Sequence, residues 1–286
     1  MHSDADPDGW TAGPPLTEPV LVAIPAFGAP DLTDRVLADL LADPAELVPD
    51  TSIVVVDNGG DYRPADAVRA DPRLEVYRPG SNLRWINSAN WALDRAVAAG
   101  AGVCLVLNND VRLSTGFLSG LTRSFADCAD VAVTAPCYDD FWLHQRARSI
   151  PAAAAEFEPA LAYRSVPFCD GTAWAVSVAA AEVVGRLDTA TFPRHGYGAD
   201  LDFALRAGEA GLRSVVTDAA YVSHLRRGTM DRLPDETRER NRGEILTGMN
   251  ARWGDTWRAR LGLSDDAFPP HNSGSAGSWY ASDRWT

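Results

Sequence analysis

The stretch LVLNNDV, residues 105–111, indicates the fold of this chain most directly. With Val103 before it, it opens as a run of branched apolar residues, which predicts a strand buried on both faces of a sheet. The run then ends abruptly in Asn108, Asn109 and Asp110. Ligands of α/β proteins collect at the carboxyl ends of such strands, so Asp110 is a candidate for holding Mg²⁺ or Mn²⁺ against a diphosphate. A plain polar turn explains the same triplet, because Asn and Asp favour turns.

The composition excludes several classes of protein. Of the 286 residues 46% are hydrophobic, which allows a large core in one domain or in two closely joined lobes. The formal net charge is −13 and every basic residue other than histidine is arginine, which argues against nucleic-acid binding. No apolar run approaches the roughly 18 residues of a membrane span, and the first residues do not resemble a secretory signal. We therefore expect a cytoplasmic protein whose four cysteines are free thiols.

Strand-like and helix-like patterns alternate along the first half of the chain. Apolar runs predict strands at 20–24, 52–56, 103–107 and 131–135, and an alternating pattern predicts a short strand at 74–77. Amphipathic spacing predicts helices at 31–41, from about 85 to a stop at Gly100, and at 115–126. This alternation predicts an α/β fold, a Rossmann-like three-layer α/β/α sandwich around a mostly parallel central sheet.

The second half is less regular. Residues 138–166 have no clean period and are expected to form an irregular connection. A strand at 173–176, a helix near 179–186, a second helix opening around Asp200 and short strands at 214–217 and 221–224 follow. We expect a flexible arm at 1–18, a domain at 19–230 with halves 19–136 and 137–230, a helical segment at 231–265, and a flexible tail at 266–286.

Further polar residues occur where predicted strands end or helices begin. Asp57 ends a buried β-branched run, and Asn82 and Arg84 lie at a helix start, where free N–H groups attract anions. Asp200 lies in the first turn of a helix, and His224 ends a strand. Each has a structural alternative: a strand-terminal turn, a helix cap, a solvated arginine, a first-turn acid that stabilises the helix dipole, and a hydrogen-bonded core histidine.

The types, order and spacing of these residues resemble one family. From about residue 20 to 229 the chain is similar to the inverting, nucleotide-sugar-dependent family-2 glycosyltransferases of the GT-A fold, near the bacterial rhamnosyltransferase branch. The segments that carry the resemblance are IPAF (24–27), VDN (56–58), 82–93, NND (108–110), DG (170–171), 197–206 and SH (223–224). They are specific to a superfamily and not to a substrate.

The resemblance implies a role for each matching position. Asp110 matches the metal-binding carboxylate of the Asp-x-Asp motif, His224 matches a histidine that completes the metal or diphosphate site, and Asp200 matches the general base. The cofactor would be a divalent cation, Mg²⁺ or Mn²⁺. The half 19–136 would bind the nucleoside-diphosphate sugar through Pro25, Phe27, Asp57, Asn82, Arg84, Asn90, Asn108 and Asn109. The half 137–230 would bind a small-molecule, glycan or lipid-linked acceptor through Asp170, Gly171, Trp174 and Tyr197.

Three positions depart from the family pattern. Ala199 stands where the family usually has Glu, Arg84 stands where many relatives have Gly, and Asn108 replaces the first Asp of the motif. These departures leave a nucleotide-sugar binder without catalysis as an alternative. A nucleotidyltransferase is another alternative, although residues 24–30 lack the Gly-rich loop with a basic residue that it would need. A lipid-linked acceptor would place the protein at a membrane surface, and a homodimer is left open.

Overall fold

The computed structural model of the protein describes residues 16–42, 50–138, 142–224, 235–265 and 267, with the backbone alone for 235–242. The strands are β1 (Val20–Ala26), β2 (Thr51–Asp57), β3 (Leu74–Tyr77), β4 (Val103–Leu107), β5 (Val111–Leu113), β6 (Val131–Tyr138), β7 (Tyr163–Val166), β8 (Ala173–Ser177) and β9 (Arg213–His224). The helices are α1 (Pro30–Leu41), α2 (Asp66–Arg69), α3 (Arg84–Ala99), α4 (Phe117–Asp127), α5 (Val178–Val184), α6 (Ala199–Glu209), α7 (Asp235–Trp253) and α8 (Trp257–Arg260).

All nine of these strands form one sheet, in the order β3-β2-β1-β4-β8-β6-β9-β5, with β7 paired to β9. The neighbours β3, β2, β1 and β4 are parallel, as are β6 and β9. Strand β8 is antiparallel to both β4 and β6, and β5 and β7 are antiparallel to β9. One edge of the sheet therefore collects the carboxyl ends of β1, β2, β4, β6 and β9 together with the amino ends of β5 and β8.

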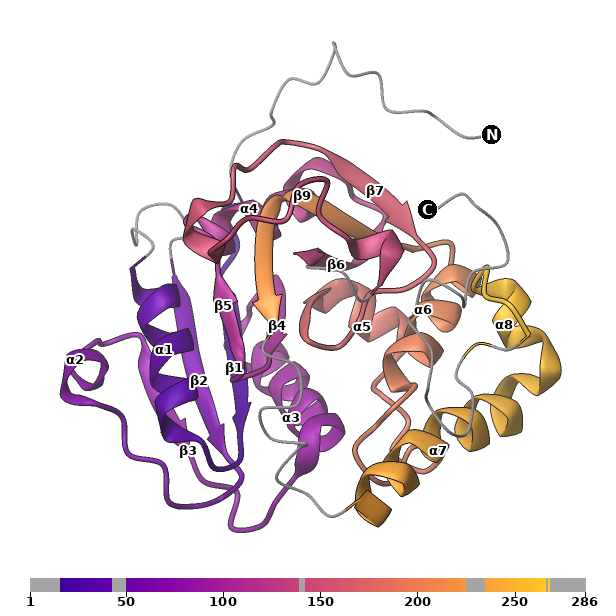
Figure 1. Ribbon diagram of the computed structural model, residues 1–286, viewed down its shortest axis with the longest axis horizontal. Coiled ribbons are helices and arrows are strands. Elements are labelled where there is room, and N and C mark those ends of the chain that lie inside the picture. The colour runs from indigo at the N-terminus through magenta and orange to yellow at the C-terminus, as the bar shows by residue number, and fades with distance from the viewer. Residues whose placement is uncertain (1–15, 43–49, 139–141, 225–234, 266, 268–286) are drawn as a thin grey trace.

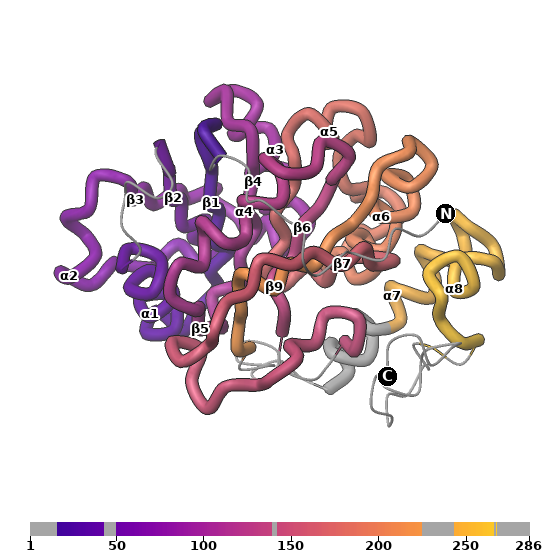
Figure 2. Tube along the Cα trace, turned by 90° about the horizontal axis from the view of Figure 1, so that it is seen from above, coloured from indigo at the N-terminus to yellow at the C-terminus, as the bar shows by residue number. Residues whose placement is uncertain are grey.

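Two apolar cores lie on opposite faces of the sheet. Alternate residues along β1 point to opposite sides, so Leu21 and Ala23 join one core and Val22 and Ile24 join the other. The first core includes α3, α5 and α6, and the second includes α1 and α4. Figure 2 shows α3 and α5 on one side of the strands and α1 on the other. The prediction of a three-layer α/β/α sandwich is confirmed, with a mixed sheet.

The predicted elements of the first half match the structure closely. The predicted stop of α3 is confirmed: Gly100 has a φ of 67° and donates its backbone N–H to the last turn of the helix. Strand β5 and the single-turn helix α2 were not predicted, because three residues are too few to show an alternation and four residues are little more than one turn of a helix.

Two expectations for the second half were wrong in detail. The connection 138–166 contains β7, which pairs with β9. The two short strands expected at 214–217 and 221–224 are one strand, β9. A bulge lies between them, because Thr217 pairs with Pro136 while Tyr221 pairs with the next residue, Cys137. The inserted residues interrupt the sequence pattern without ending the strand.

The two halves of the predicted domain share the one sheet, and the C-terminal helices pack beside the second half. Figure 1 shows α6, α7 and α8 on the right of the molecule, away from α1 and α2. Leu16, at the described end of the predicted arm, is buried. Residues 1–15 and 268–286, expected to be flexible, lie outside the described residues. Within the described part of the chain, no helix has the length and apolar character needed to cross a bilayer.

Candidate functional site

The site is built from chain segments that meet at the edge where β1, β2, β4 and β9 end. Asp57 is the last residue of β2, residues 108–110 connect β4 to β5, and His224 is the last residue of β9. The turn at residues 170–172 enters β8 at the same edge. Polar side chains that are far apart in the sequence are gathered here because the strands that carry them run side by side.

Asp110 and His224 are in direct contact. His224 is paired with Val111 in the β5–β9 ladder, which places its imidazole beside the carboxylate of the preceding residue, with Nε2 3.2 Å from Asp110 Oδ1. Carboxylate oxygen and imidazole nitrogen are ligands that Mn²⁺ accepts, and Mg²⁺ or Mn²⁺ bound with a diphosphate needs only one or two protein ligands. The pair therefore fits a cation shared with a substrate. No group of three or more His, Cys, Asp or Glu side chains arranged for a metal occurs among the described residues.

The carboxylate of Asp57 is almost fully buried and stabilises the loop that follows β2. Oδ1 accepts the N–H of Gly60 at 2.8 Å, and Oδ2 accepts the N–H of Tyr62 at 3.0 Å and lies 3.2 Å from Nε of Arg78. The strand-terminal turn, which was the structural alternative for Asp57, is therefore present. Its predicted role in holding the nucleoside stays a prediction.

The neighbouring Asn58 was not predicted as a site residue, yet it fixes the start of α3. Its Oδ1 accepts the N–H of Leu83 at 2.8 Å and its Nδ2 donates to Ser88 Oγ at 3.2 Å. Asn82 caps the same turn by accepting the N–H of Arg84 at 2.7 Å. These amides hold the loop that leads into α3 against the end of β2.

Arg84 has a φ of 59°, a region that disfavours every residue except glycine. This is a physical reason for glycine at the same place in relatives. The exposed side chain of Arg84 donates from Nη1 to the carbonyl of Pro193 at 3.2 Å, so it joins the start of α3 to the loop before α6.

Other predicted donor-binding residues make contacts inside the protein. The Asn90 side chain exchanges two hydrogen bonds with the backbone of Leu187, both at 2.9 Å. Asn109 is buried and donates to Thr33 Oγ1 at 3.0 Å. Asn108 is less buried, at the end of β4, while Pro25 lies within β1 and Phe27 follows it with 47% of its surface exposed. Phe27 is thus the most exposed of these five, while Pro25, Asn90 and Asn108 are half-buried.

Asp200 lies in the first turn of α6, partly buried. Its Oδ1 accepts the N–H of Leu201 at 3.0 Å and its Oδ2 accepts the N–H of Gly171 at 3.1 Å. Burial and, to a smaller extent, the negative charge of Asp170 raise the pKa of Asp200 from 3.8 to about 7, although these backbone N–H groups oppose the shift. A carboxyl group with this pKa can exchange a proton near neutral pH.

The Asp170–Gly171 turn lies beside Asp200. The carboxylate of Asp170 accepts hydrogen bonds from Trp142 Nε1 at 2.9 Å and from the N–H of Thr172 at 2.8 Å. Trp85 covers Gly171: its Nε1 donates to the Gly171 carbonyl at 3.1 Å, and a Cβ on Gly171 would lie 2.7 Å from the Trp85 ring. A larger residue there would displace the Trp85 ring.

The other two residues predicted to bind the acceptor differ in exposure. The Trp174 side chain is buried and packs edge-on against Phe203 of α6, with ring centroids 5.0 Å apart. Tyr197 is partly exposed in the loop that leads into α6. Of this pair, only Tyr197 presents surface to a ligand.

Two acidic residues that support α6 were missed by sequence reasoning. Asp202 is fully buried and pairs with Nε of Arg206 at 2.9 Å and Nε of Arg252 at 2.6 Å. Glu244 of α7 is 6% exposed and accepts four backbone N–H groups from residues 194–197. The spacing of Asp202 and Arg206 suggests a helical pair, whereas nothing in the sequence connects Glu244 with a loop almost 50 residues away.

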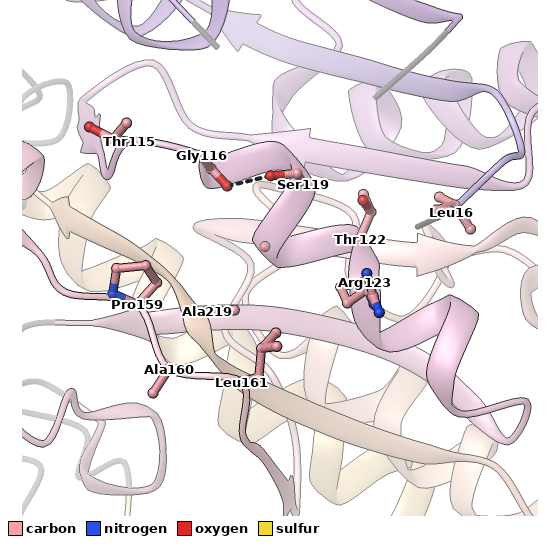
Figure 3. A pocket seen from close by; sticks show the side chains of 11 residues that line it. Leu16, Thr115, Gly116, Ser119, Thr122, Arg123, Pro159, Ala160, Leu161 and Ala219 are labelled. Carbon is pink, nitrogen blue, oxygen red and sulfur yellow. Dashed lines mark hydrogen bonds between the residues drawn. The ribbon is translucent and has the colours of Figure 1, made fainter. Parts of the chain in front are cut away.

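A cavity of about 370 Å³ lies elsewhere, between α4 and the segment 159–161. Figure 3 shows Thr122 and Arg123 of α4 on one side of it and Pro159 and Leu161 on the other. None of the predicted site residues lines it. It lies beyond the carboxyl end of β5, toward the opposite edge of the sheet from the candidate site.

The fold and the polar residues at the carboxyl ends of its strands are typical of α/β proteins, which commonly bind ligands at this edge of the sheet. The profile of the family described as "Glycosyl transferase family 2" matches residues 21–185, which is more than half of the chain. This protein belongs to glycosyltransferase family 2. The resemblance to family-2 glycosyltransferases seen in the sequence is thereby confirmed.

The chain is also similar to proteins in two mycobacteria and to solved structures. The uncharacterized protein Rv1525 of Mycobacterium tuberculosis and Mb1552 of Mycobacterium bovis are each 34% identical over 213 residues, covering 73% of this chain and 75% of theirs. Mannosyltransferase PcManGT from Pyrobaculum calidifontis, in complex with GDP-Man and Mn²⁺, superposes with a TM-score of 0.60 at 14% identity, over 92% of this chain and 76% of that one.

GalNAc-T7 with UDP, GalNAc and Mn²⁺ superposes with a TM-score of 0.58 at 12% identity, over 90% of this chain and 52% of that one. At such low identity these two structures establish the GT-A fold alone. The predicted fold class is thereby confirmed, and the protein is a glycosyltransferase.

Proposed function

We propose that the protein transfers a sugar from a nucleoside-diphosphate sugar to an acceptor hydroxyl with inversion at the anomeric carbon, with Asp200 as the general base. The observation that carries this proposal is the state of Asp200, a partly buried carboxyl at the site edge with a pKa raised to about 7. An acceptor hydroxyl is a poor nucleophile near neutral pH, so a base in this position has a specific task.

The reaction needs one displacement. The acceptor oxygen attacks the anomeric carbon while its proton passes to the Asp200 carboxylate. The bond from that carbon to the diphosphate breaks, and its electron pair leaves with the nucleoside diphosphate. Because attack and departure take place on opposite faces of the carbon, the configuration inverts without a covalent nucleophile.

Asp110 and His224, whose side chains lie 3.2 Å apart, would hold Mg²⁺ or Mn²⁺. The two fold relatives solved with Mn²⁺ support the use of a divalent cation. When bound, the cation would neutralise charge on the leaving diphosphate. Asn58 and Asn82 accept the N–H groups of Leu83 and Arg84 and so fix the start of α3, where the helix dipole would favour an anion. The Asp170–Gly171 turn orients Asp200 through the Gly171 N–H.

Donor turnover tests the proposal. Purified protein with Mn²⁺ is incubated with UDP-, GDP- and dTDP-sugars, with water and simple alcohols as acceptors, and release of the nucleoside diphosphate is measured. We expect turnover with at least one donor, a product of inverted configuration by NMR, and a loss of about 10²-fold or more in kcat for Asp200→Asn. If the protein binds a nucleoside diphosphate but consumes no donor, it is a binding protein. A fully active Asp200→Asn variant would mean that another group is the base.

A further inference from the structure

The carboxylate of Glu244 is enclosed by four successive backbone N–H groups. Oε1 accepts from Arg194 at 2.6 Å, and Oε2 accepts from His195 at 3.1 Å, Gly196 at 3.1 Å and Tyr197 at 3.3 Å. Successive N–H groups that converge on one anion form a nest, and hydrogen bonds to a charged group are stronger than those between neutral groups. Glu244 belongs to α7, so a helix remote in sequence fastens this loop.

The opposite side of the loop is held by α3. Arg84 donates to the carbonyl of Pro193, and Gly196 passes so close to α3 that an added Cβ would lie 2.5 Å from Cβ of Ile86. Gly196 also has a φ of 89°, which favours glycine. The loop therefore lies between the first turn of α3, on the predicted donor side, and Glu244 of α7.

Any movement of the loop reaches Asp200 directly. The Gly196 carbonyl accepts the N–H of Ala199, and the Gly198 carbonyl accepts the N–H of Asp202, both at 2.9 Å, so the loop and the first turn of α6 are one hydrogen-bonded unit. Asp200 lies only three residues after the last N–H group that Glu244 accepts.

A second attachment lies on the other side of Asp200. Near the end of α7, Arg252 Nε lies 2.6 Å from Asp202 Oδ1, and Trp253 Nε1 donates to the same oxygen at 2.9 Å. Helix α7 thus grips the chain at residues 194–197 and again at Asp202, and Asp200 falls between the two points. Figure 1 shows α7 running beside the part of the fold that contains α6.

We infer that α7 is a clamp for the base-bearing turn, and that Glu244 is a positioning residue that fixes Asp200 for catalysis. The inference rests on the proposed function. A helix that only covered the core would not require a buried carboxylate, because removing a charge from water is costly unless hydrogen bonds compensate it. Among the described residues, the compensation comes from four N–H groups of the loop that leads to Asp200, so the carboxylate and the loop conformation depend on each other.

The test compares Glu244→Gln, Glu244→Asp and a matched control. Gln keeps the size of the side chain but leaves one acceptor oxygen for four N–H groups and directs an NH₂ group at donors. Asp keeps the charge. The control is Glu209→Gln on α6, since Glu209 is exposed and pairs only with Arg260 among the contacts described.

We expect Glu244→Gln to lower kcat by about 10²-fold with the donor KM nearly unchanged, since a small misplacement of a catalytic group has an effect of this size. Hydrogen exchange at the amides of 195–197 should become at least tenfold faster. Compared with Glu244→Gln, the Glu244→Asp variant should recover part of the kcat and part of the protection from exchange. Glu209→Gln should have the kcat and the exchange rates of the wild type. Unchanged kcat or unchanged exchange in Glu244→Gln would overturn the inference. A loss of kcat that is accompanied by a loss of donor affinity and a lower Tm would also overturn it, because it would show general damage to the fold.

A protein without any donor turnover would refute the proposed function but not this inference. In that case the titration of the Asp200 carboxyl, followed by ¹³C NMR, decides. If Glu244 positions Asp200, the Glu244→Gln substitution shifts the pKa of Asp200 away from about 7, whereas Glu209→Gln leaves that pKa unchanged. An identical titration in both variants would show that Glu244 has no influence on Asp200.

Discussion

Replacing Asp200 with Asn should stabilise the protein at alkaline pH while removing its activity. The folded-state pKa of about 7 lies above the ordinary value of 3.8, so the folded state binds more protons than the unfolded state between these values. The stability of the wild type therefore falls as the pH rises from about 4 to about 7 and is level above that. The amide of the Asp200→Asn variant has no charge to bury, so the variant would not show this loss.

The magnitude follows from the shift. A shift of one pKa unit corresponds to about 1.4 kcal/mol. At pH 9 the ionised carboxylate of Asp200 therefore lowers the free energy of unfolding by at most about 4 kcal/mol. Asn can accept only one of the two hydrogen bonds from Gly171 and Leu201, so the variant loses one bond and with it about 1 kcal/mol of stability. The net gain should be about 2 to 3 kcal/mol at pH 9 and near zero or slightly negative at pH 4.

Thermal unfolding from pH 4 to pH 9 measures the difference. For a chain of this size, a gain of 2 to 3 kcal/mol corresponds to a rise of roughly 3 to 5 °C in Tm. The Tm difference between variant and wild type should grow through the range from pH 4 to 7 and then stay constant. If the Tm difference between Asp200→Asn and the wild type is no larger at pH 9 than at pH 4, Asp200 does not have a raised pKa. The argument for it as a base near neutral pH then fails.

Four further predictions address its surroundings. Asp170→Asn removes a negative charge beside Asp200, so the acid limb of the kcat profile should move to lower pH; a move to higher pH would contradict the assigned cause. Asp110→Asn should abolish the extra rise in Tm that Mn²⁺ gives with a nucleoside diphosphate, and an undiminished rise would place the cation elsewhere. Arg84→Gly should be about 1 kcal/mol more stable than Arg84→Ala in urea unfolding, because only glycine fits the positive φ, and equal stabilities would speak against strain there. Asp202→Asn should cost about 3 kcal/mol or more in the same assay, because buried arginine contacts lose their charged partner; a loss below about 1 kcal/mol would mean that α7 is held mainly by other contacts.

Much of the site could be predicted because strand ends are local signals. Asp57 and Asp110 end apolar runs, and the carboxyl ends of neighbouring parallel strands share an edge, so their approach needs no knowledge of side-chain packing. The resemblance assigned Asp110 and His224 to one metal site, and the β5–β9 register brings their side chains into contact. The strand β5 that creates this register is three residues long and could not be recognised in advance.

Side-chain direction was harder to predict than position. Asn90 and Asn109 lie in the predicted segments, yet their amides bond to Leu187 and Thr33. An amide can serve a ligand or the protein equally well, and its partner depends on which element packs nearby. The family pattern gave their segment, whereas the packing of α1 and of the chain after α5 determined their contacts.

The sequence by itself determined the alternation of strands and helices, the two apolar faces of the sheet, and the polar strand ends where a ligand would bind, because these depend on periods of a few residues. Only the tertiary structure decided the environment of Asp200. Its raised pKa arises from burial and from Asp170, and the loop before it is held by Glu244 of a distant helix. Burial and long-range hydrogen bonds depend on which elements pack together, and no local pattern contains that information.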